Sequence, residues 1–182
     1  MNSIKLSKLA TFFILLSAIF TQDVAGQSSR KDKRILADSK KAKTTFIQTD
    51  PGMKNLFDHS YGYAIFPNVG KAGFGVGGAS GNGTVFKQGK AIGSARLTQM
   101  NVGFQMGVQG YREVIFFETK ESLDQFKENR LEVSAQVSAV VAASGASASA
   151  KYSNGILIFT HPKGGLMFEA TVGGQTFSFK EY

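Results

Sequence analysis

The sequence predicts an α+β fold: a strongly curved, mostly antiparallel sheet with a barrel-like core of about eight strands, an N-terminal amphipathic helix and a second helix. Three observations predict it. Between residues 61 and 179 most segments have the apolar or alternating pattern of strands. Small residues, glycine above all, recur on one face of several of these segments. Only two substantial stretches have helical spacing.

Residues 1–26 have the layout of a signal peptide: Lys5 and Lys8, an apolar run from Leu9 to Phe20, and small residues before Gln27. The run is shorter than the roughly 18 residues of a membrane span. We therefore expect an exported protein, periplasmic or secreted, in which residues 27–182 form a single domain. The chain has no cysteine and a net charge of +8, which favours anionic lipid or glycan partners over nucleic acid.

Residues 28–49 are predicted to form the N-terminal helix, because a serine can cap its start and Pro51 ends it. At helical spacing, Ile35 and Phe46 share a narrow face with small and polar residues. The opposite face is cationic, with Arg30, Lys33, Arg34, Lys40 and Lys41. Such a helix either covers a sheet with its apolar face or lies on a membrane surface. The pattern alone favours the first interpretation.

The strands follow a short turn of helix near residues 51–58. The first, "YGYAIF" (61–66), is expected to end at Pro67. Further strands are predicted at "EVIFFET" (113–119), "VSAQVSAV" (133–140), "ASASA" (146–150), "GILIFTH" (155–161), "GLMFEAT" (165–171) and "QTFSF" (175–179), with "PKGG" (162–165) as a hairpin turn. The second helix is predicted at "KESLDQFKENR" (120–130), with Thr119 as its cap.

The segment "GKAGFGVGGASGNG" contains the spacing G-x-G-x-x-G at Gly73, Gly75 and Gly78. A dinucleotide site requires a helix directly after these glycines, because the helix N-terminus holds the pyrophosphate. Here turn and strand residues follow instead. We therefore interpret Gly73, Gly75, Gly77 and Gly78 as structural glycines that allow close backbone approach in a bent sheet.

Catalytic chemistry has little support in the sequence. The two histidines, His59 and His161, stand apart from any cluster of carboxylates, and no G-x-S-x-G elbow occurs. We expect a non-enzymatic protein that uses no metal and no cofactor.

Four segments resemble the SYLF domain, also known as the Ysc-type actin-binding or lipid-binding domain: "YAIFPNVGKAGFGVGGASGNGTVF", "MNVGFQMGVQ", "EVIFFETKESLDQF" and "KGGLMFEATVGG". The resemblance extends from about Ile35 to the C-terminus and is closest to the exported bacterial branch. It implies a phospholipid-binding module whose N-terminal helix contributes to binding. The chain has no tryptophan, and residues 87–99 lack the Trp-Ser-x-Pro pattern of eukaryotic members, which argues against actin binding and phosphoinositide preference.

The resemblance adds a membrane role to the helix over residues 30–47. Its cationic residues are expected to bind anionic headgroups first. Ile35, Leu36, Phe46 and Ile47 would then insert into the membrane, which requires the helix to move away from the sheet. Lys71, Arg96 and Arg112 are candidates for extending the cationic surface.

Two other functions fit an exported chain of this kind. One is a small outer-membrane β-barrel, against which "VIFF" and "ILIF" argue, because both are apolar on both faces. The other is an extracytoplasmic scaffold that binds a protein partner and has no lipid affinity.

Overall fold

The computed structural model describes residues 29–133 and 139–182, so the predicted signal peptide lies outside it. Residues 29–34 belong to one compact unit, Met1–Arg34, and the remainder to a second, Ile35–Tyr182. A helix over residues 29–49 comes first in the described chain. It is followed by α2 (Met53–His59), β1 (Gly62–Lys87), β2 (Lys90–Phe117), α3 (Lys120–Lys127), β3 (Glu132–Val133), β4 (Val140–Val141), α4 (Ala146–Ser149) and β5 (Ile156–Glu181).

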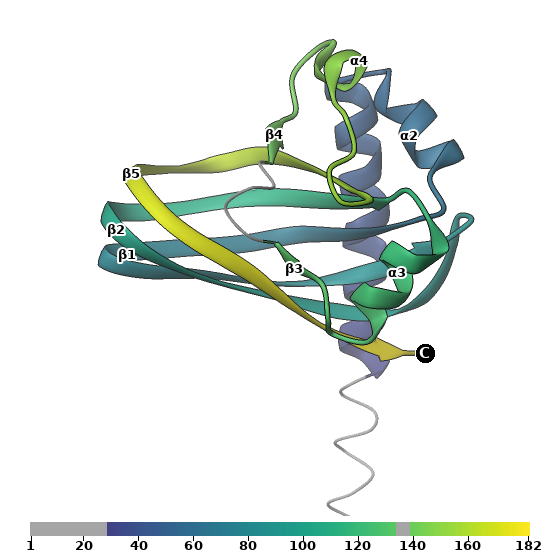
Figure 1. Ribbon diagram of the computed structural model, residues 1–182, viewed down its shortest axis with the longest axis horizontal. Coiled ribbons are helices and arrows are strands. Elements are labelled where there is room, and N and C mark those ends of the chain that lie inside the picture. The colour runs from purple at the N-terminus through teal and green to yellow at the C-terminus, as the bar shows by residue number, and fades with distance from the viewer. Residues whose placement is uncertain (1–28, 134–138) are drawn as a thin grey trace, which may run out of the picture. The chain divides into compact units, whose positions relative to one another are not determined.

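The sheet is antiparallel in the order β1-β2-β5-β3, and the short β4 pairs in parallel with β5. The expected mixture of helices with a mostly antiparallel sheet is confirmed, but the count of about eight strands is wrong. Three very long strands, β1, β2 and β5, replace most of the short ones, and each bends back at the same end of the unit (Figure 1). Bending divides them into a first arm (62–74, 106–117 and 156–168) and a second arm (76–87, 90–102 and 172–181).

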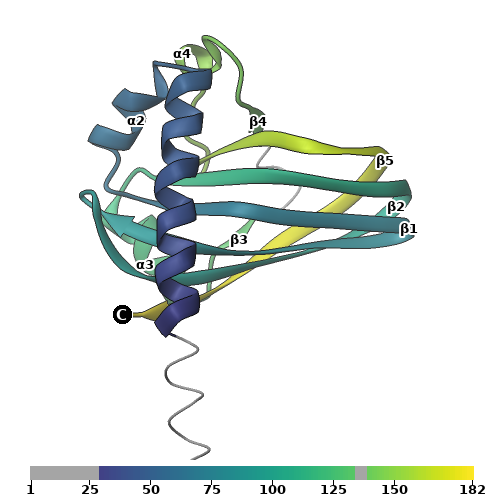
Figure 2. The ribbon, with the colours of Figure 1, turned by 180° about the vertical axis from the view of Figure 1, so that it is seen from behind.

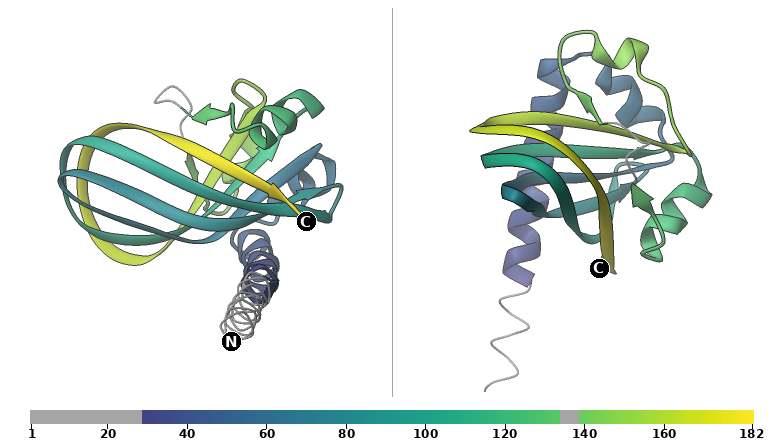
Figure 3. Two further views of the ribbon diagram at one scale, coloured as in Figure 1. Left: turned by 90° about the horizontal axis from the view of Figure 1, so that it is seen from below. Right: turned by 60° about the vertical axis from the view of Figure 1, so that its left-hand side comes forward.

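Glycine allows the strands to bend without ending. Gly75 has a φ of 72°, and a register shift in the β1–β2 ladder falls at this residue. The predicted hairpin turn at 162–165 is also a position inside a continuous strand, β5, where Gly165 has a φ of 96°. Pro67 likewise does not end its strand. Among the described strands β1 pairs only with β2, and a proline on an unpaired edge removes no ladder hydrogen bond. Figure 3 shows the resulting curvature from two further directions.

The two arms of β1 approach each other closely along the sheet. A Cβ atom placed on Gly83, in the second arm, would lie 2.4 Å from the carbonyl oxygen of Ile65 in the first. The buried hydroxyl of Ser39 donates to that same oxygen and lies 3.3 Å from the hydroxyl of Thr84. The N-terminal helix therefore covers the place where the arms meet.

The sheet remains open, which corrects the expectation of a barrel-like core. Among the described strands, the order runs from β1 at one edge to β3 at the other. The short strands pair with different arms of β5: β3 with Gln175 and Thr176, and β4 with Phe159 and Thr160.

Two hydrophobic clusters form the core. The first lies between the arms and includes Phe66, Leu97 and Ile115, with Phe126 of α3 packed against it. The second lies on the outer face of the first arm, where Phe46 and Phe57 cover Phe116. Figure 2 shows the helix crossing the strands on this side, at the end opposite to the bend.

The remaining predicted elements differ in outcome. The second helix is confirmed as α3, and the short helical turn near residue 51 as α2. The alternating segment 146–150 was predicted as a strand but forms the short helix α4 after Gly145, so this prediction is wrong. Alanine favours helix at such a position, and the alternation of two small residues gave no real strand signal. Within the predicted strand 133–140, Val133 and Val140 are strand residues, and 134–138 lie outside the described residues.

Thr119 begins α3 with a reciprocal capping box. Its side chain accepts a hydrogen bond from the backbone amide of Ser122, and the Ser122 hydroxyl accepts one from the amide of Thr119. We expect Thr119→Ala to destabilise the protein by about 1 kcal/mol, as measured by urea unfolding. Thr119→Ser, which retains the hydroxyl, is the matched control, and equal losses in both variants would contradict a capping role.

Candidate functional site

The predicted cationic residues of the helix are all exposed. Lys40 and Lys41 lie on the part of the helix that belongs to the main unit. Arg30, Lys33 and Arg34 are exposed helical residues of the N-terminal unit. The helix therefore presents cations to its surroundings throughout the described range.

The predicted insertion residues are placed differently. Phe46 is fully buried in the outer cluster, with its ring edge-on to the ring of His161 at a centroid distance of 6.2 Å. Ile35, Leu36 and Ile47 are half-buried, and the last two pack against the same cluster. Removing a phenylalanine from a core costs about 3–5 kcal/mol. Insertion of this face would thus require the helix to leave the sheet at high cost.

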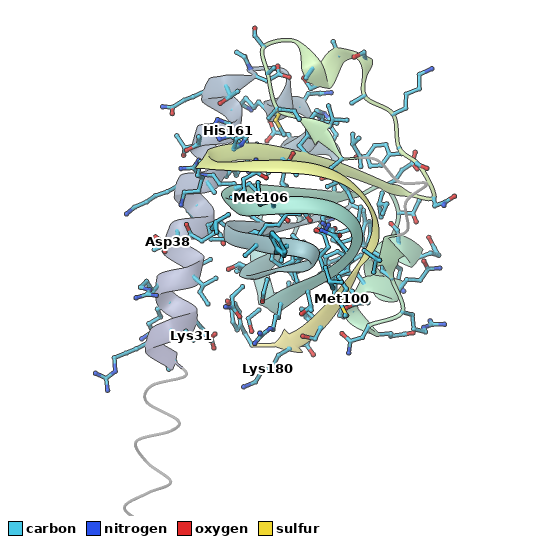
Figure 4. The ribbon with its side chains drawn as sticks, turned by 90° about the vertical axis from the view of Figure 1, so that its left-hand side faces the viewer. Lys31, Asp38, Met100, Met106, His161 and Lys180 are labelled. Carbon is cyan, nitrogen blue, oxygen red and sulfur yellow. The ribbon has the colours of Figure 1, made fainter. Side chains whose placement is uncertain are left out.

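Three cations from three different elements surround one pocket beside the helix. Lys41 comes from the helix, Arg112 from β2 and Lys163 from β5. The pocket has a volume of about 150 Å³ and is completed by Asp38, Ala42, Thr45, Pro67 and Asn68. This volume admits a few water molecules or one small anion. Figure 4 shows Asp38 on the helix and His161 near this side of the sheet.

The charges in the pocket favour an anion. Its lining carries three cationic side chains and one carboxylate, that of Asp38. Lys163 donates from Nζ to Oδ1 of Asn68, and Arg112 Nη1 lies 3.2 Å from Nδ1 of His161. These contacts hold the two cations of the sheet in place while the pocket keeps a positive balance, which is the arrangement that binds phosphate or carboxylate.

Of the other cations considered from the sequence, only Arg112 reaches this pocket. Lys71 is buried, and Arg96 is exposed on the second arm. Sequence reasoning missed Lys163, because "PKGG" was interpreted as a turn. The pairing of Arg112 with His161 in the β2–β5 ladder brings Lys163 near Arg112, and no local sequence pattern indicates this pairing.

The structural glycines lie in β1 at and beside the bend. Gly73 pairs with Gly107 and Gly77 with Asn101, while a Cβ on Gly78 would lie 2.9 Å from the carbonyl oxygen of Gln99. The whole G-x-G-x-x-G motif is strand, and no helix begins after it within β1. The motif therefore lacks the helix N-terminus on which a phosphate-binding loop depends.

A cluster of polar side chains lies between the arms. Glu113 is fully buried, and its Oε2 accepts a hydrogen bond of 3.0 Å from Nε2 of Gln175. The same Nε2 of Gln175 also donates to Oε1 of Gln99, and Nε2 of Gln99 donates to Oδ1 of Asn101. Burial raises the pKa of Glu113 to about 7, and the bond from Gln175 only partly opposes this. Among the described side chains, nothing hydrogen-bonds to Glu113 Oε1.

The described ranges contain neither a metal-binding cluster nor a membrane-spanning helix. No group of three or more metal-binding side chains occurs in residues 29–133 and 139–182. In the same ranges, no helix combines the length and the apolar character needed to cross a membrane.

Comparisons with known proteins agree with the resemblance in the sequence. Residues 98–181 match the family model described as Ysc84, Las17-binding protein actin regulator. The chain is also 30% identical over 139 residues to beta cell expansion factor A of Aeromonas veronii, a match that covers 70% of this chain. The chain spans about half of that relative, 49% of its length. Through residues 98–181, the chain therefore belongs to the Ysc84, or SYLF-domain, family.

Proposed function

We propose that this protein is an exported, non-enzymatic binding module that associates with anionic phospholipid surfaces through its exposed cations. The observation that carries the proposal is the convergence of Lys41, Arg112 and Lys163 on one pocket beside a cation-rich helix. The pocket would receive the phosphate of a lipid headgroup. Membership in a family of binding domains supports a binding function.

The docked helix changes the mechanism expected from the sequence. Because Phe46 is held in the core, the helix would contribute its charge and not its apolar face. Each lysine or arginine near an anionic membrane contributes about 1 kcal/mol. A handful of such residues gives reversible binding that weakens as salt is added.

The test is co-sedimentation of the purified protein with anionic and neutral vesicles. The triple variant Lys41→Gln, Arg112→Gln and Lys163→Gln is expected to lose at least tenfold in affinity for anionic vesicles, since about 1.4 kcal/mol corresponds to tenfold. The matched control replaces the exposed Lys90, Lys151 and Lys180 with glutamine, which removes the same charge elsewhere. Its loss should be clearly smaller.

Two outcomes would contradict the proposal. Equal losses in the two triple variants would show that net charge, and not the pocket, controls binding. Equal pelleting with anionic and neutral vesicles, or none with either, would favour a protein partner of the kind that the family description names. A third variant, in which Lys33, Arg34, Lys40 and Lys41 become glutamate, measures the contribution of the helix.

A further inference from the structure

The bend of the sheet exposes an unusual number of large apolar side chains. Six of them have exposed fractions between 50% and 83%, and together they are called the apolar bend: Phe74, Val76, Met100, Val102, Met106 and Val108. Phe74 pairs with Met106 and Val76 with Val102. Directly paired residues of antiparallel strands point to the same face. The apolar bend is therefore one continuous outer surface, and Figure 4 shows Met100 and Met106 on it.

The inner face at the same end of the sheet is polar. Gln99, Asn101 and Gln175 lie on the inside, where they connect to the buried Glu113. A sheet in water places its apolar residues inside and its polar residues outside. The opposite arrangement, apolar outside and polar inside, is typical of sheets that face lipid.

Around the apolar bend, β1 and β2 carry no charge, and β5 carries Glu169, which pairs with Gln105. Residues 72–86 of β1 and 97–111 of β2 contain no Asp, Glu, Lys, Arg or His. β2 is paired with β5 throughout this region, and with β1 at residues 97–102 and 106–111, on either side of the register shift at the bend. The backbone groups of these paired residues need no water, which is the condition for entering hydrocarbon.

The cationic pocket lies on the same outer face, between the helix and the apolar bend. Arg112 and Val108 both point outward from β2, four residues apart, which corresponds to about 13 Å along a strand. Each headgroup layer of a bilayer is roughly 5–8 Å thick. A protein whose pocket holds a headgroup phosphate would therefore place the bend among the acyl chains.

We propose that the apolar bend inserts into the acyl-chain layer of an anionic bilayer while the pocket binds headgroups. This inference rests on the proposed function but assigns insertion to the sheet instead of the helix. The protein would then be held by side chains inserted among the acyl chains, principally Phe74 and Met106, as well as by attraction between its cations and the headgroups.

The natural absence of tryptophan provides a direct test. Phe74→Trp places a single reporter on the bend, and Tyr182→Trp places one on another exposed aromatic position near the C-terminus. Both proteins are mixed with anionic vesicles that contain lipids brominated on their acyl chains. The emission of Trp at position 74 should shift to the blue and be quenched at least twofold, while Trp at position 182 should not change.

A second variant tests the energetic role of the bend. Val76→Asp and Met106→Asp together should weaken binding to anionic vesicles at least tenfold, with the urea midpoint of unfolding retained. If the parent protein pellets with anionic vesicles but Trp at position 74 is not quenched, insertion is wrong and the proposed function stands. Failure of the parent protein to pellet overturns both.

A second copy of the chain could cover the same surface. In that case the emission of the Phe74→Trp protein shifts to the blue with rising protein concentration in the absence of vesicles, and sedimentation shows a dimer. That result would replace membrane insertion with self-association.

Discussion

Replacing Gly83 with alanine is expected to destabilise the fold by about 3 kcal/mol, at the upper end of the cost of overpacking. The new Cβ would lie 2.4 Å from the carbonyl oxygen of Ile65 and 2.7 Å from the ring of Phe66. One of these contacts is with backbone, so a rotamer change cannot relieve it. The arms of β1 would have to separate, which would also disturb the hydrogen bond from Ser39 to Ile65.

Urea unfolding followed by far-UV circular dichroism measures this loss. Gly70→Ala is the matched control in the same strand, because a Cβ there would meet no atom within 4 Å. Its stability should stay within about 0.5 kcal/mol of the parent protein, as is usual for open surface positions. Similar midpoints for the two variants would mean that the arms are not in contact at Gly83.

Replacing Glu113 with glutamine is expected to stabilise the protein at pH 8 by about 3 kcal/mol. Burial raises the pKa of this carboxyl from 4.5 to about 7 in the folded state. A folded pKa above the unfolded one gives stability that is complete below about pH 4.5 and is lost as the pH rises through 7. Glutamine keeps the shape and the acceptor for Gln175, and it removes the buried charge.

The measurement is the difference in unfolding free energy between Glu113→Gln and the parent protein from pH 4 to pH 8. This difference should be small at pH 4 and should grow across the interval between pH 4.5 and pH 7. Glu118→Gln, one residue beyond the end of β2 and exposed, is the control for the loss of a carboxylate from the surface. A flat profile for Glu113→Gln would place this carboxyl in contact with water.

The sequence patterns predicted the components of the fold better than their connections. Thr119 and the spacing of Leu123 and Phe126 were sufficient to place α3, because capping and amphipathic spacing act over a few residues. The segment around Gly165 was divided into two strands by a predicted turn, because glycine is equally common in turns and in bends. A bend within one strand differs from a turn between two strands because the bent strand stays paired with β2 on both sides of the glycine. Such pairing is not a local property of the sequence.

The candidate site was predictable only where it depends on local sequence patterns. Lys40 and Lys41 follow from helical spacing, and both are exposed. Lys163 joins Lys41 only because β5 lies beside β2 and because the helix crosses both strands. Phe74 and Val76 alternate with glycine in the sequence, but their outward direction depends on which side of the curved sheet becomes the interior.

β2 forms one ladder with β1 and another with β5, and the chain connections that close these two ladders lie at opposite ends of β2. The β1–β2 ladder closes at a two-residue connection, Gln88 and Gly89, both with positive φ, and Lys87 pairs with Lys90 there. The β2–β5 ladder begins at the far end, where Phe117 pairs with Ile156. Hairpins zip from their turns because short loops close fastest. We expect the β1–β2 hairpin to form early as a template and the C-terminal strand to join it late, so truncation of that strand should leave a partly ordered hairpin with an exposed β2 edge.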